Sequence, residues 1–342
     1  MSNGLIHNWD LAESIWEYTL TDRLRVQPNE HPLLMAEPAH NTTEKREKMT
    51  EIMFERFEIP ALFVAKDPVL ICFANARSTG LVIDSCGEMT TCTPVFEGYA
   101  LQKGIVRSSL GGNRVSDELV SLLELKTGKK ILPAYAARKK SLGDGRFQSV
   151  YLDFPNTTAS YRRWATQLVA DDLKHTVCRV FDSKFDANAN ANIPCVQYEL
   201  PDGNILDVGP ERFAASDLLF DPSELADQTN FNAEPLIGLH QVIHNSISKC
   251  DIDLRRELYS NIIVTGGNTL LPGFTERLNK ELLDSGPPQK IKLIATNYAA
   301  ERKYAVWIGG SILASLGSFQ QMWMSKEEYL EFGSSLVDRK CP

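Results

Sequence analysis

The sequence lacks cysteine pairs of the CxxC type, and it lacks apolar runs long enough to cross a membrane. Its seven cysteines are odd in number and scattered, a pattern that argues against a disulfide-stapled secreted domain and indicates reduced thiols. A membrane-spanning helix needs about 18 to 20 consecutive apolar residues, and no stretch reaches that length. The opening residues, MSNGLIHNWD, have no basic start and no apolar stretch, so no signal peptide is visible. We expect a soluble intracellular protein.

An excess of positive charge is also missing, since the formal net charge is −8 at pH 7. This balance argues against a protein that wraps nucleic acid with a broad basic face, although it leaves room for a small basic patch. The 342 residues, of which 43% are hydrophobic and 23% charged, have the composition of an ordinary globular protein. The length predicts two domains with separate cores.

The most informative stretch is 261–279, which reads NIIVTGGNTLLPGFTERLN. Ile262, Ile263 and Val264 have the composition of a buried strand, and Gly266-Gly267 end it. We expect a helix to begin at Pro272. A strand that passes through glycines into a helix N-terminus suits a phosphate or a nucleotide edge, because backbone N–H groups and the helix dipole face one point. Two glycines alone fit a ligand-free turn better.

The rest of the chain alternates between helical and strand patterns. Capping residues and apolar spacing predict helices after Asp10 (with Leu11, Ile15 and Tyr18 inward), after Asn41, from Ser116 to Lys126, from Tyr161 to Val177 and from Ser325 to Gly333. Strands are predicted near 33–35, 59–65 and 291–295, with hairpins over 81–95 and 196–208. Residues 129–154 show no clear pattern and are predicted to be loop. Strands alternating with helices indicate α/β layers.

Two local features bear on possible sites. Asp67-Pro68 predicts a helix with Asp67 as its N-cap and the proline at its first position. His240 and His244 are spaced i, i+4, but no third ligand is near in the sequence. A packed or surface helix face is therefore the better reading, and we expect no metal site.

Long collinear stretches resemble the actin family. They include RVQPNEHPLLMAEPAHNTTEKREKMTEIMFERFEIPALFVA, STGLVIDSCGEMTTCTPVFEGYAL, CDIDLRRELYSNIIVTGGNTLLPGFTERL and WIGGSILASLGSFQQMWMSKEEY, and only 129–192 diverges. LFDPS at 219–223, LQKGIV at 101–106, GGNTL at 266–270, GSFQQMW at 317–323 and the closing RKCP look more like the nuclear actin-like proteins of the actin-related protein 4 type. The Trp307–Tyr329 block disfavours sugar kinases and chaperone ATPases of the same fold.

The resemblance implies an α/β fold with two actin-like (ribonuclease-H-like) domains around a nucleotide cleft. By this reading, residues 1–74 and 305–342 form a first, incomplete domain, and 75–304 form the second, with 111–234 as its smaller subdomain. Met1 falls inside the family pattern, so the first phosphate loop and three strands of the first sheet are not in the sequence. We expect that sheet to have a bare edge and an uncovered face.

The resemblance also implies a degenerate nucleotide site. The family positions match Asp84, Ser85 and Gly87 on the phosphate side, Gly112 and Lys174 on the sugar and base side, and Gly266, Gly267 and Lys303 in the adenosine pocket. Cys86 and Glu88 replace glycines and make the phosphate loop bulkier and more negative. His175 stands in place of a ribose-binding carboxylate, and Leu271 in place of an aromatic residue.

Hydrolysis is disfavoured at two further positions. The family's water-orienting glutamine corresponds to Asp67 and a nearby histidine to Thr91, and water orientation is much of what such a site contributes. We therefore expect no enzymatic turnover and no bound metal, and we expect Mg-ATP to bind weakly or not at all.

A partner surface is implied as well. Actins dock partner helices in an apolar cleft at the hinge end, and the matching positions are Phe73, Ala76, Ser78, Gly98, Tyr99, Ile308, Ile312, Leu313, Leu316, Ser318 and Met322. The resemblance implies a nuclear protein, with some in the cytoplasm. It would act as a non-catalytic subunit of chromatin-remodelling and histone-acetyltransferase complexes and regulate transcription. Its partners would be a helix of the remodeller ATPase, actin, other complex subunits and histones, with no sequence-specific nucleic acid and no membrane. The alternative is a cytoskeletal, ATP-binding filament protein.

Overall fold

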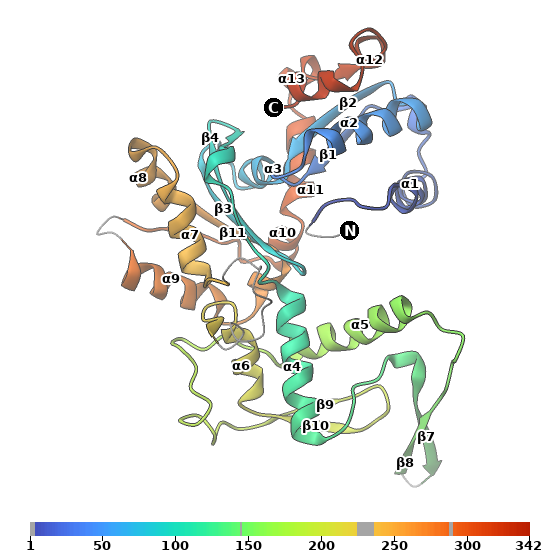
Figure 1. The fold of residues 1–342 in the computed structure, drawn as a ribbon, viewed down its shortest axis with the longest axis vertical. Helices are drawn as coiled ribbons and strands as arrows, with labels where there is room; N and C mark the ends of the chain where they lie inside the picture. Colours follow the sequence, from blue (N-terminus) through green and yellow to red (C-terminus); the bar gives the residue numbers. More distant parts are fainter. Residues whose placement is uncertain (1–3, 144–145, 224–235, 287–289) are drawn as a thin grey trace.

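The computed structural model describes residues 4–143, 146–223, 236–286 and 290–342. Figure 1 shows three tiers, with the elements nearest the two termini at the top, a long sheet in the middle, and α4, α5 and two hairpins below. No helix in these ranges is long and apolar enough to cross a bilayer.

The upper tier is built on a three-stranded sheet in the order β1-β2-β13. β1 (Leu33–Glu37) runs parallel to β2 (Ala61–Lys66), and β13 (Met324–Ser325) pairs antiparallel with β2. Within the described ranges β1 pairs with β2 alone, so β1 forms the sheet edge. Packed against this sheet are α2 (Thr43–Glu51) with its π-helical extension Ile52–Arg56, α12 (Lys326–Phe332) and α13 (Val337–Lys340).

The middle tier is a six-stranded sheet. Its strands, in the order β12-β11-β3-β4-β5 with β6 also beside β4, are β12 (Leu293–Ile294), β11 (Ile262–Thr265), β3 (Gly80–Ser85), β4 (Thr90–Phe96), β5 (Tyr99–Ala100) and β6 (Val106–Ser108). α7 (Leu239–Ser248), α8 (Ile252–Ser260) and α9 (Phe274–Ser285) share its core. β11 runs parallel to β3 and is buried at all four positions, as its β-branched sequence predicts.

The lower tier extends from the middle one. It contains α4 (Gly112–Thr127), α5 (Ala159–Val177), α6 (Glu211–Asp217), the hairpin of β7 (Ala137–Gly143) with β8 (Arg146–Tyr151), and the hairpin of β9 (Val196–Glu199) with β10 (Ile205–Val208). α4 packs against α5 and α6. Its apolar residues belong to the same core as the middle sheet.

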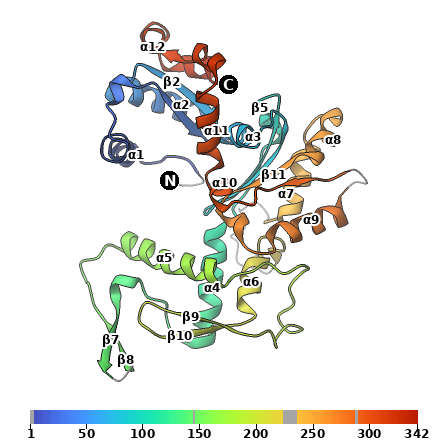
Figure 2. The ribbon, with the colours of Figure 1, turned by 180° about the vertical axis from the view of Figure 1, so that it is seen from behind.

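Two helices join the upper and middle tiers. α3 (Asp67–Ala74) and α11 (Ala305–Ala314, preceded by α10, Ala299–Lys303) lie side by side in both views (Figures 1 and 2). A β-carbon placed on Gly309 would collide with the Leu70 carbonyl oxygen, so glycine is what permits the close crossing. Ile71 and Ala305 share a small core with Val82, Val95 and Ile263 of the middle sheet.

The layered α/β architecture predicted from the sequence is present, while the residue bounds of its domains stay a prediction. The helix start predicted at Ser325 is present, with a capping box formed by Ser325 and Glu328, and Gly128 ends α4 in the left-handed conformation. The two predicted hairpins are also present.

Four local predictions are wrong. The first helix, α1 (Trp9–Glu17), is capped by Asn8, whose Oδ1 accepts the Leu11 N–H at 3.0 Å, and not by Asp10. It packs through Trp9 and Trp16, so Leu11, Ile15 and Tyr18 are more than half exposed. The helix expected from Ser116 begins four residues earlier, at Gly112. Residues 129–154, predicted to be loop, contain the β7–β8 hairpin.

Candidate functional site

A cavity of about 450 Å³ lies where the middle sheet meets the lower tier. It is lined by the β3–β4 turn, the start of α4, the end of α5, the loop after β11 and the segment around α10. Five of the predicted nucleotide-binding residues line it, namely Gly87, Gly112, Lys174, Gly267 and Lys303. The fold therefore brings together residues that lie far apart in the sequence. We refer to this cavity as the base-side pocket.

The N-terminus of α4 is docked onto the β3–β4 turn. Gly112 N–H donates to the Cys86 carbonyl at 2.9 Å, and Asn113 N–H donates to the Gly87 carbonyl at 2.7 Å. Gly111 permits this approach, because an added β-carbon would lie 2.6 Å from the Gly87 carbonyl oxygen. Two of the N–H groups that a helix start leaves without intrahelical partners are thus already paired.

Lys174 is buried in the wall of the base-side pocket, at 4% exposure. Its Nζ donates to the Gly112 carbonyl at 3.0 Å and to Asp171 Oδ1 at 3.1 Å. Burial acts to raise the pKa of Asp171, but hydrogen bonds from Ser116 and Lys174 outweigh it and hold that pKa below its ordinary value. Lys174 therefore links α5 to the start of α4, and most of its hydrogen-bonding capacity is used inside the protein.

Gly266 and Ser85 lie behind the pocket lining. Gly266 has φ +96°, and an added β-carbon would collide with the Ser85 carbonyl and approach Asp84 Oδ1 to 2.6 Å. The Ser85 hydroxyl is buried, accepts from Asn268 Nδ2 at 3.0 Å and shares a hydrogen bond with Thr90 Oγ1 at 2.8 Å. Both residues support the site from within and leave Gly267, Lys303 and Asn268 to face the cavity.

The helix expected to begin at Pro272 is displaced. A 3-10 turn, Gly267–Leu270, follows β11, and α9 begins at Phe274 with a left-handed Gly273 before it. An added β-carbon on Gly273 would collide with the Val180 carbonyl oxygen. The predicted helix N-terminus therefore packs against the segment after α5, and the nearer polar groups come from the 3-10 turn.

Three groups in the base-side pocket remain open to a ligand. Lys303 is exposed, with its Nζ 5.6 Å from the centre of the Tyr304 ring. The pKa of His175 is lowered by burial and by the nearby Lys174, so its imidazole is neutral at pH 7. Asn268 Oδ1 is buried and has no hydrogen-bond donor among the described residues, which leaves an acceptor for a ligand amino or hydroxyl group.

A second cavity, of about 310 Å³, holds the acidic end of the cleft. Asp67, Asp84, Thr91 and Glu88 line it, so the two positions that replace the water-orienting residues, Asp67 and Thr91, lie in one place. No Lys or Arg occurs in its described lining. Lys66 is nearby, but its Nζ is paired with Glu37 at 2.5 Å.

The carboxylates at the acidic end are costly to ionise. Burial, and then the neighbouring Asp84, raise the pKa of Asp67 to about 7. Burial also raises the pKa of Asp84, against a hydrogen bond from the Cys86 thiol at 3.3 Å. Asp67 is the first residue of α3, whose N-cap is Lys66 with no side-chain capping bond. The expected capping role of Asp67 is thus wrong, and its side chain faces the cavity instead.

The residues present fit the two halves of Mg-ATP unequally. Gly267, Lys303 and the open Asn268 acceptor fit a nucleoside. The acidic end would place phosphate oxygens beside half-buried carboxyl groups, and its described lining contains no Lys or Arg to neutralise them. The protein's own residues therefore fit the phosphates poorly, and the neutralising charge would have to come from the metal ion that accompanies the nucleotide.

The predicted partner residues lie on α3, α11 and β5 and in the segments adjoining these elements. Tyr99 is 59% exposed, and Ile312, Leu316 and Met322 are each about 40% exposed. Phe73 and Ile308 are half-buried and Ala76 is exposed. Leu313 differs from the others because it is buried in the core of the upper tier. Figure 2 shows the elements concerned, with β5 close to α3 and α3 beside α11. We call the exposed members the hinge surface.

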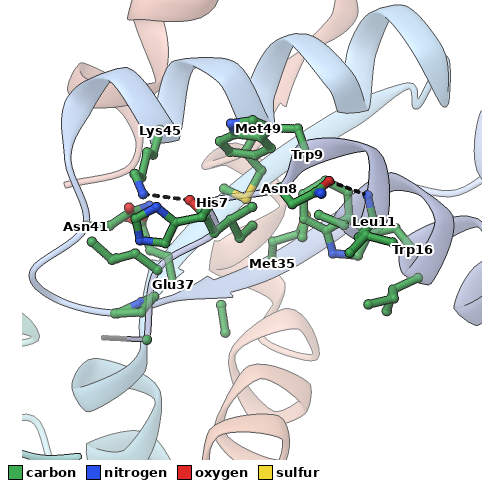
Figure 3. Close-up of a pocket in the computed structure, with 17 residues that line it drawn as sticks. His7, Asn8, Trp9, Leu11, Trp16, Met35, Glu37, Asn41, Lys45 and Met49 are labelled. Carbon is green, nitrogen blue, oxygen red and sulfur yellow. Dashed lines mark hydrogen bonds between the residues drawn. The ribbon is translucent and has the colours of Figure 1, made fainter. Parts of the chain in front are cut away.

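A further apolar cavity, of about 330 Å³, lies between α1 and β1 (Figure 3). Trp9, Leu11, Met35 and Met49 line it, and Lys45 Nζ donates to the Ile6 carbonyl across its rim at 2.6 Å. Its polar lining residues are His7, Asn8, Glu37, Asn41 and Lys45, and Glu37 is ion-paired with Lys66. It lies at the free edge of the upper sheet.

The two histidines of α7 are held by neighbouring helices. His244 contacts the Tyr259 hydroxyl at 2.9 Å and Ser285 Oγ at 3.0 Å, and His240 Nδ1 lies 2.7 Å from Glu281 Oε2. Within the described part of the chain, no group of three or more His, Cys, Asp or Glu is placed to share a metal ion.

Sequence reasoning missed Asn113, Asn268 and Asp171. Asn268 directly follows the two glycines, which was an available signal. Asp171 carried none, because its role depends on Ser116 and Gln167 as well as on Lys174.

Comparison with known proteins gives a uniform result. The family described as Actin matches residues 1–342. Proteins named Actin-related protein 4 are 46% identical in Arabidopsis thaliana and 45% identical in Oryza sativa subsp. japonica, covering all of this chain and 79% and 78% of the relatives. The Schizosaccharomyces pombe protein of that name is 34% identical over 99% of this chain and 84% of its own length. The chain belongs to the actin family.

Proposed function

We propose that this protein is a non-catalytic actin-related subunit of nuclear chromatin-remodelling and histone-acetyltransferase complexes, and that it regulates transcription there by docking a helix of the motor ATPase. Its other partners would be actin, further complex subunits and histones. Similarity to proteins named Actin-related protein 4 in plants and fission yeast supports the class of protein.

The hinge surface is the observation that carries the proposal. Ile312 lies in the last turn of α11 and Leu316 lies two residues after that helix, and both are about 40% exposed although Leu313 is buried. Exposed apolar side chains from α11, the following turn and β5 can accept the apolar stripe of an amphipathic helix, whose anchors recur at i, i+3, i+4 and i+7.

A non-catalytic role is supported by the acidic end of the cleft. Asp67 and Thr91 lie together there, and the raised pKa of Asp67 leaves it partly protonated at neutral pH. Neither group reproduces a glutamine–histidine arrangement for holding an attacking water.

The test is co-purification of the motor ATPase and actin with the tagged full-length chain. Ile312→Asp and Leu316→Asp should each abolish recovery of the ATPase, because a buried carboxylate opposes an apolar anchor. Leu125→Asp is the matched control, since Leu125 is 85% exposed on α4 and far along the chain from the hinge surface. Unchanged recovery with both hinge variants would remove the proposed site.

Two simple assays separate this proposal from a cytoskeletal filament role. If the proposal is right, the purified chain stays in the supernatant after centrifugation in polymerising salt, and it releases no phosphate from Mg-ATP above the buffer rate. Sedimentation as filaments, or steady phosphate release, would favour the filament protein instead.

A further inference from the structure

Residues 129–163 have a charge opposite to that of the whole chain. This segment contains eight Lys and Arg residues and two Asp, whereas the chain carries −8. It also contains Tyr135, Tyr151, Phe154 and Tyr161 among its aromatic residues. The segment runs from the end of α4 through the β7–β8 hairpin into the start of α5, so these charges are gathered at one end of the lower tier (Figure 1).

The aromatic side chains form a continuous surface beside α5. The Tyr135 ring lies 5.7 Å from Phe154 and 5.6 Å from Tyr161, and Tyr161 lies 5.5 Å from Trp164, measured between ring centres. Leu168 extends this stripe, since 161, 164 and 168 are spaced i, i+3, i+7 on one helix face. Tyr161, Trp164 and Leu168 are each 50–55% exposed, which is unusual for large apolar side chains that share a face.

A groove of about 470 Å³ is lined by Tyr135, Tyr161, Trp164 and Leu168. Its remaining walls include Ala134, Ala165 and Pro201, so most of the surface is apolar. Its polar groups include the Tyr198 hydroxyl and Asp172, which are hydrogen-bonded to each other at 2.6 Å. They also include the buried Tyr135 hydroxyl, which has no hydrogen-bond partner among the described residues. We call this cavity the aromatic groove.

Exposed cations lie on the two elements next to the aromatic groove, β7, which follows Tyr135, and the start of α5. Arg162 and Arg163 lie in the first turns of α5, where the helix dipole is positive and anionic residues are normally favoured. Arg138 and Lys140 are exposed at alternate positions of β7 and so share one face of the hairpin. None of these four forms an ion pair with another residue of the described ranges, whereas Lys139 is paired with Glu199.

We propose that the aromatic groove is a docking site for an acidic peptide segment with large apolar side chains. The exposed cations, of which Arg163 also lies near Asp117, supply charge complementarity to Asp and Glu, and the groove accepts Leu, Phe or Trp anchors. A single-stranded nucleic acid would also be drawn by the cations and could stack on Tyr and Trp. Its base edges, however, would find few open hydrogen-bonding groups, because most of the lining is apolar and Tyr198 and Asp172 are bonded to each other, so the peptide is favoured.

The test uses fluorescence anisotropy with the full-length protein and a labelled 15-residue probe of Asp, Glu, Leu and Trp. Comparison probes are the same peptide with Asn and Gln in place of the acids, a 15-residue polyglutamate and a 15-nucleotide oligo-dT. The acidic apolar peptide should bind at least tenfold more tightly than each of the others.

Two variants locate the site. The double variant Arg162→Glu, Arg163→Glu should weaken binding of the acidic apolar peptide at least tenfold. The double variant Trp164→Ala, Leu168→Ser should weaken the same binding at least tenfold, but the dependence of the affinity on salt concentration should stay as in the parent. The matched controls are Arg256→Glu, a charge reversal at an exposed position of α8, and Ile252→Ala, which removes a side chain that is 77% exposed. Thermal unfolding checks that every variant is folded.

Each outcome decides the question. Loss of peptide binding in both groove variants and in neither control supports the proposal. Equal binding by all variants, or equal binding of the neutral peptide, overturns it. If oligo-dT bound more tightly than the acidic apolar peptide and lost binding in the same variants, the groove would be assigned to nucleic acid. That result would also overturn the proposal of a peptide-docking site.

Discussion

The two ends of the cleft differ in how their charged groups are compensated. At the base-side pocket, Lys174 is buried but has two acceptors, and the N–H groups of Gly112 and Asn113 are paired. At the acidic end, the half-buried carboxyl groups of Asp67 and Asp84 lie near each other, and the described lining contains no Lys or Arg. In the base-side pocket most of these polar groups are already hydrogen-bonded within the protein and only a few are open to a ligand. The acidic end repels negatively charged groups. A cleft can therefore keep the shape of a nucleotide site while losing the electrostatics for phosphate.

The largest expected effect tests the frame of the base-side pocket. Gly266→Ala should destabilise the protein by about 4 kcal/mol, because the residue has φ +96° and its β-carbon would collide with Ser85. Gly267→Ala is the matched control, with nothing within 4 Å of an added β-carbon and an expected cost of about 1 kcal/mol or less. Urea unfolding measures both. Equal losses would mean that the strand-to-turn junction is not tightly constrained.

Lys174→Met tests whether the lysine is a structural link. The variant would leave Asp171 and the Gly112 carbonyl without their cation, so we expect a loss of about 3 kcal/mol. The side chain of Asp171 is 32% exposed, so water offsets part of the loss. A loss below about 1 kcal/mol in urea unfolding would show that Lys174 is free for a ligand.

Asp67→Asn tests the acidic end through pH. The folded pKa of about 7 exceeds the unfolded value of about 3.9, so the native state holds more protons between these values and loses stability as pH rises. The full difference in pKa corresponds to about 4 kcal/mol, but Asp67 is only half-buried and solvent screening reduces the effect. The variant should therefore be more stable than the parent by about 2 kcal/mol at pH 8 and about equal to it at pH 4. Thermal unfolding from pH 4 to 8 measures this. A difference that does not change with pH would contradict the raised pKa.

The smallest expected effect is on ligand affinity, and it distinguishes the base-side pocket from the acidic end by comparing adenosine with ATP. Lys303→Ala should weaken adenosine binding about fivefold, or about 1 kcal/mol, without changing stability, because the side chain is exposed. Asp67→Asn should instead leave the affinity for adenosine unchanged and increase the affinity for ATP. Calorimetry with both ligands gives the four values. If each variant changed adenosine and ATP by the same factor, the division of the cleft into two ends would fail.

Much of the fold follows from short-range sequence signals. The capping box at Ser325 and Glu328, the Gly128 cap and the buried β11 strand involve residues within four positions of one another. The β7–β8 hairpin was not predictable, because most side chains of β7 are exposed and leave no alternating pattern. The orientation of α1 was also missed, since two apolar faces compete and only packing selects Trp9 and Trp16 over Leu11 and Ile15.

The sequence by itself determined the family, the order of helices and strands, and which residue types reach the cleft. Tertiary structure alone decided how those residues are used. It placed Lys174 against a carbonyl 62 positions away, buried Ser85 against Asn268, and set Asp67 beside Asp84. The reason is physical: a cap or a strand is stabilised by neighbours in the chain, whereas the pKa of a carboxyl group depends on which distant groups the packed fold brings within a few ångströms.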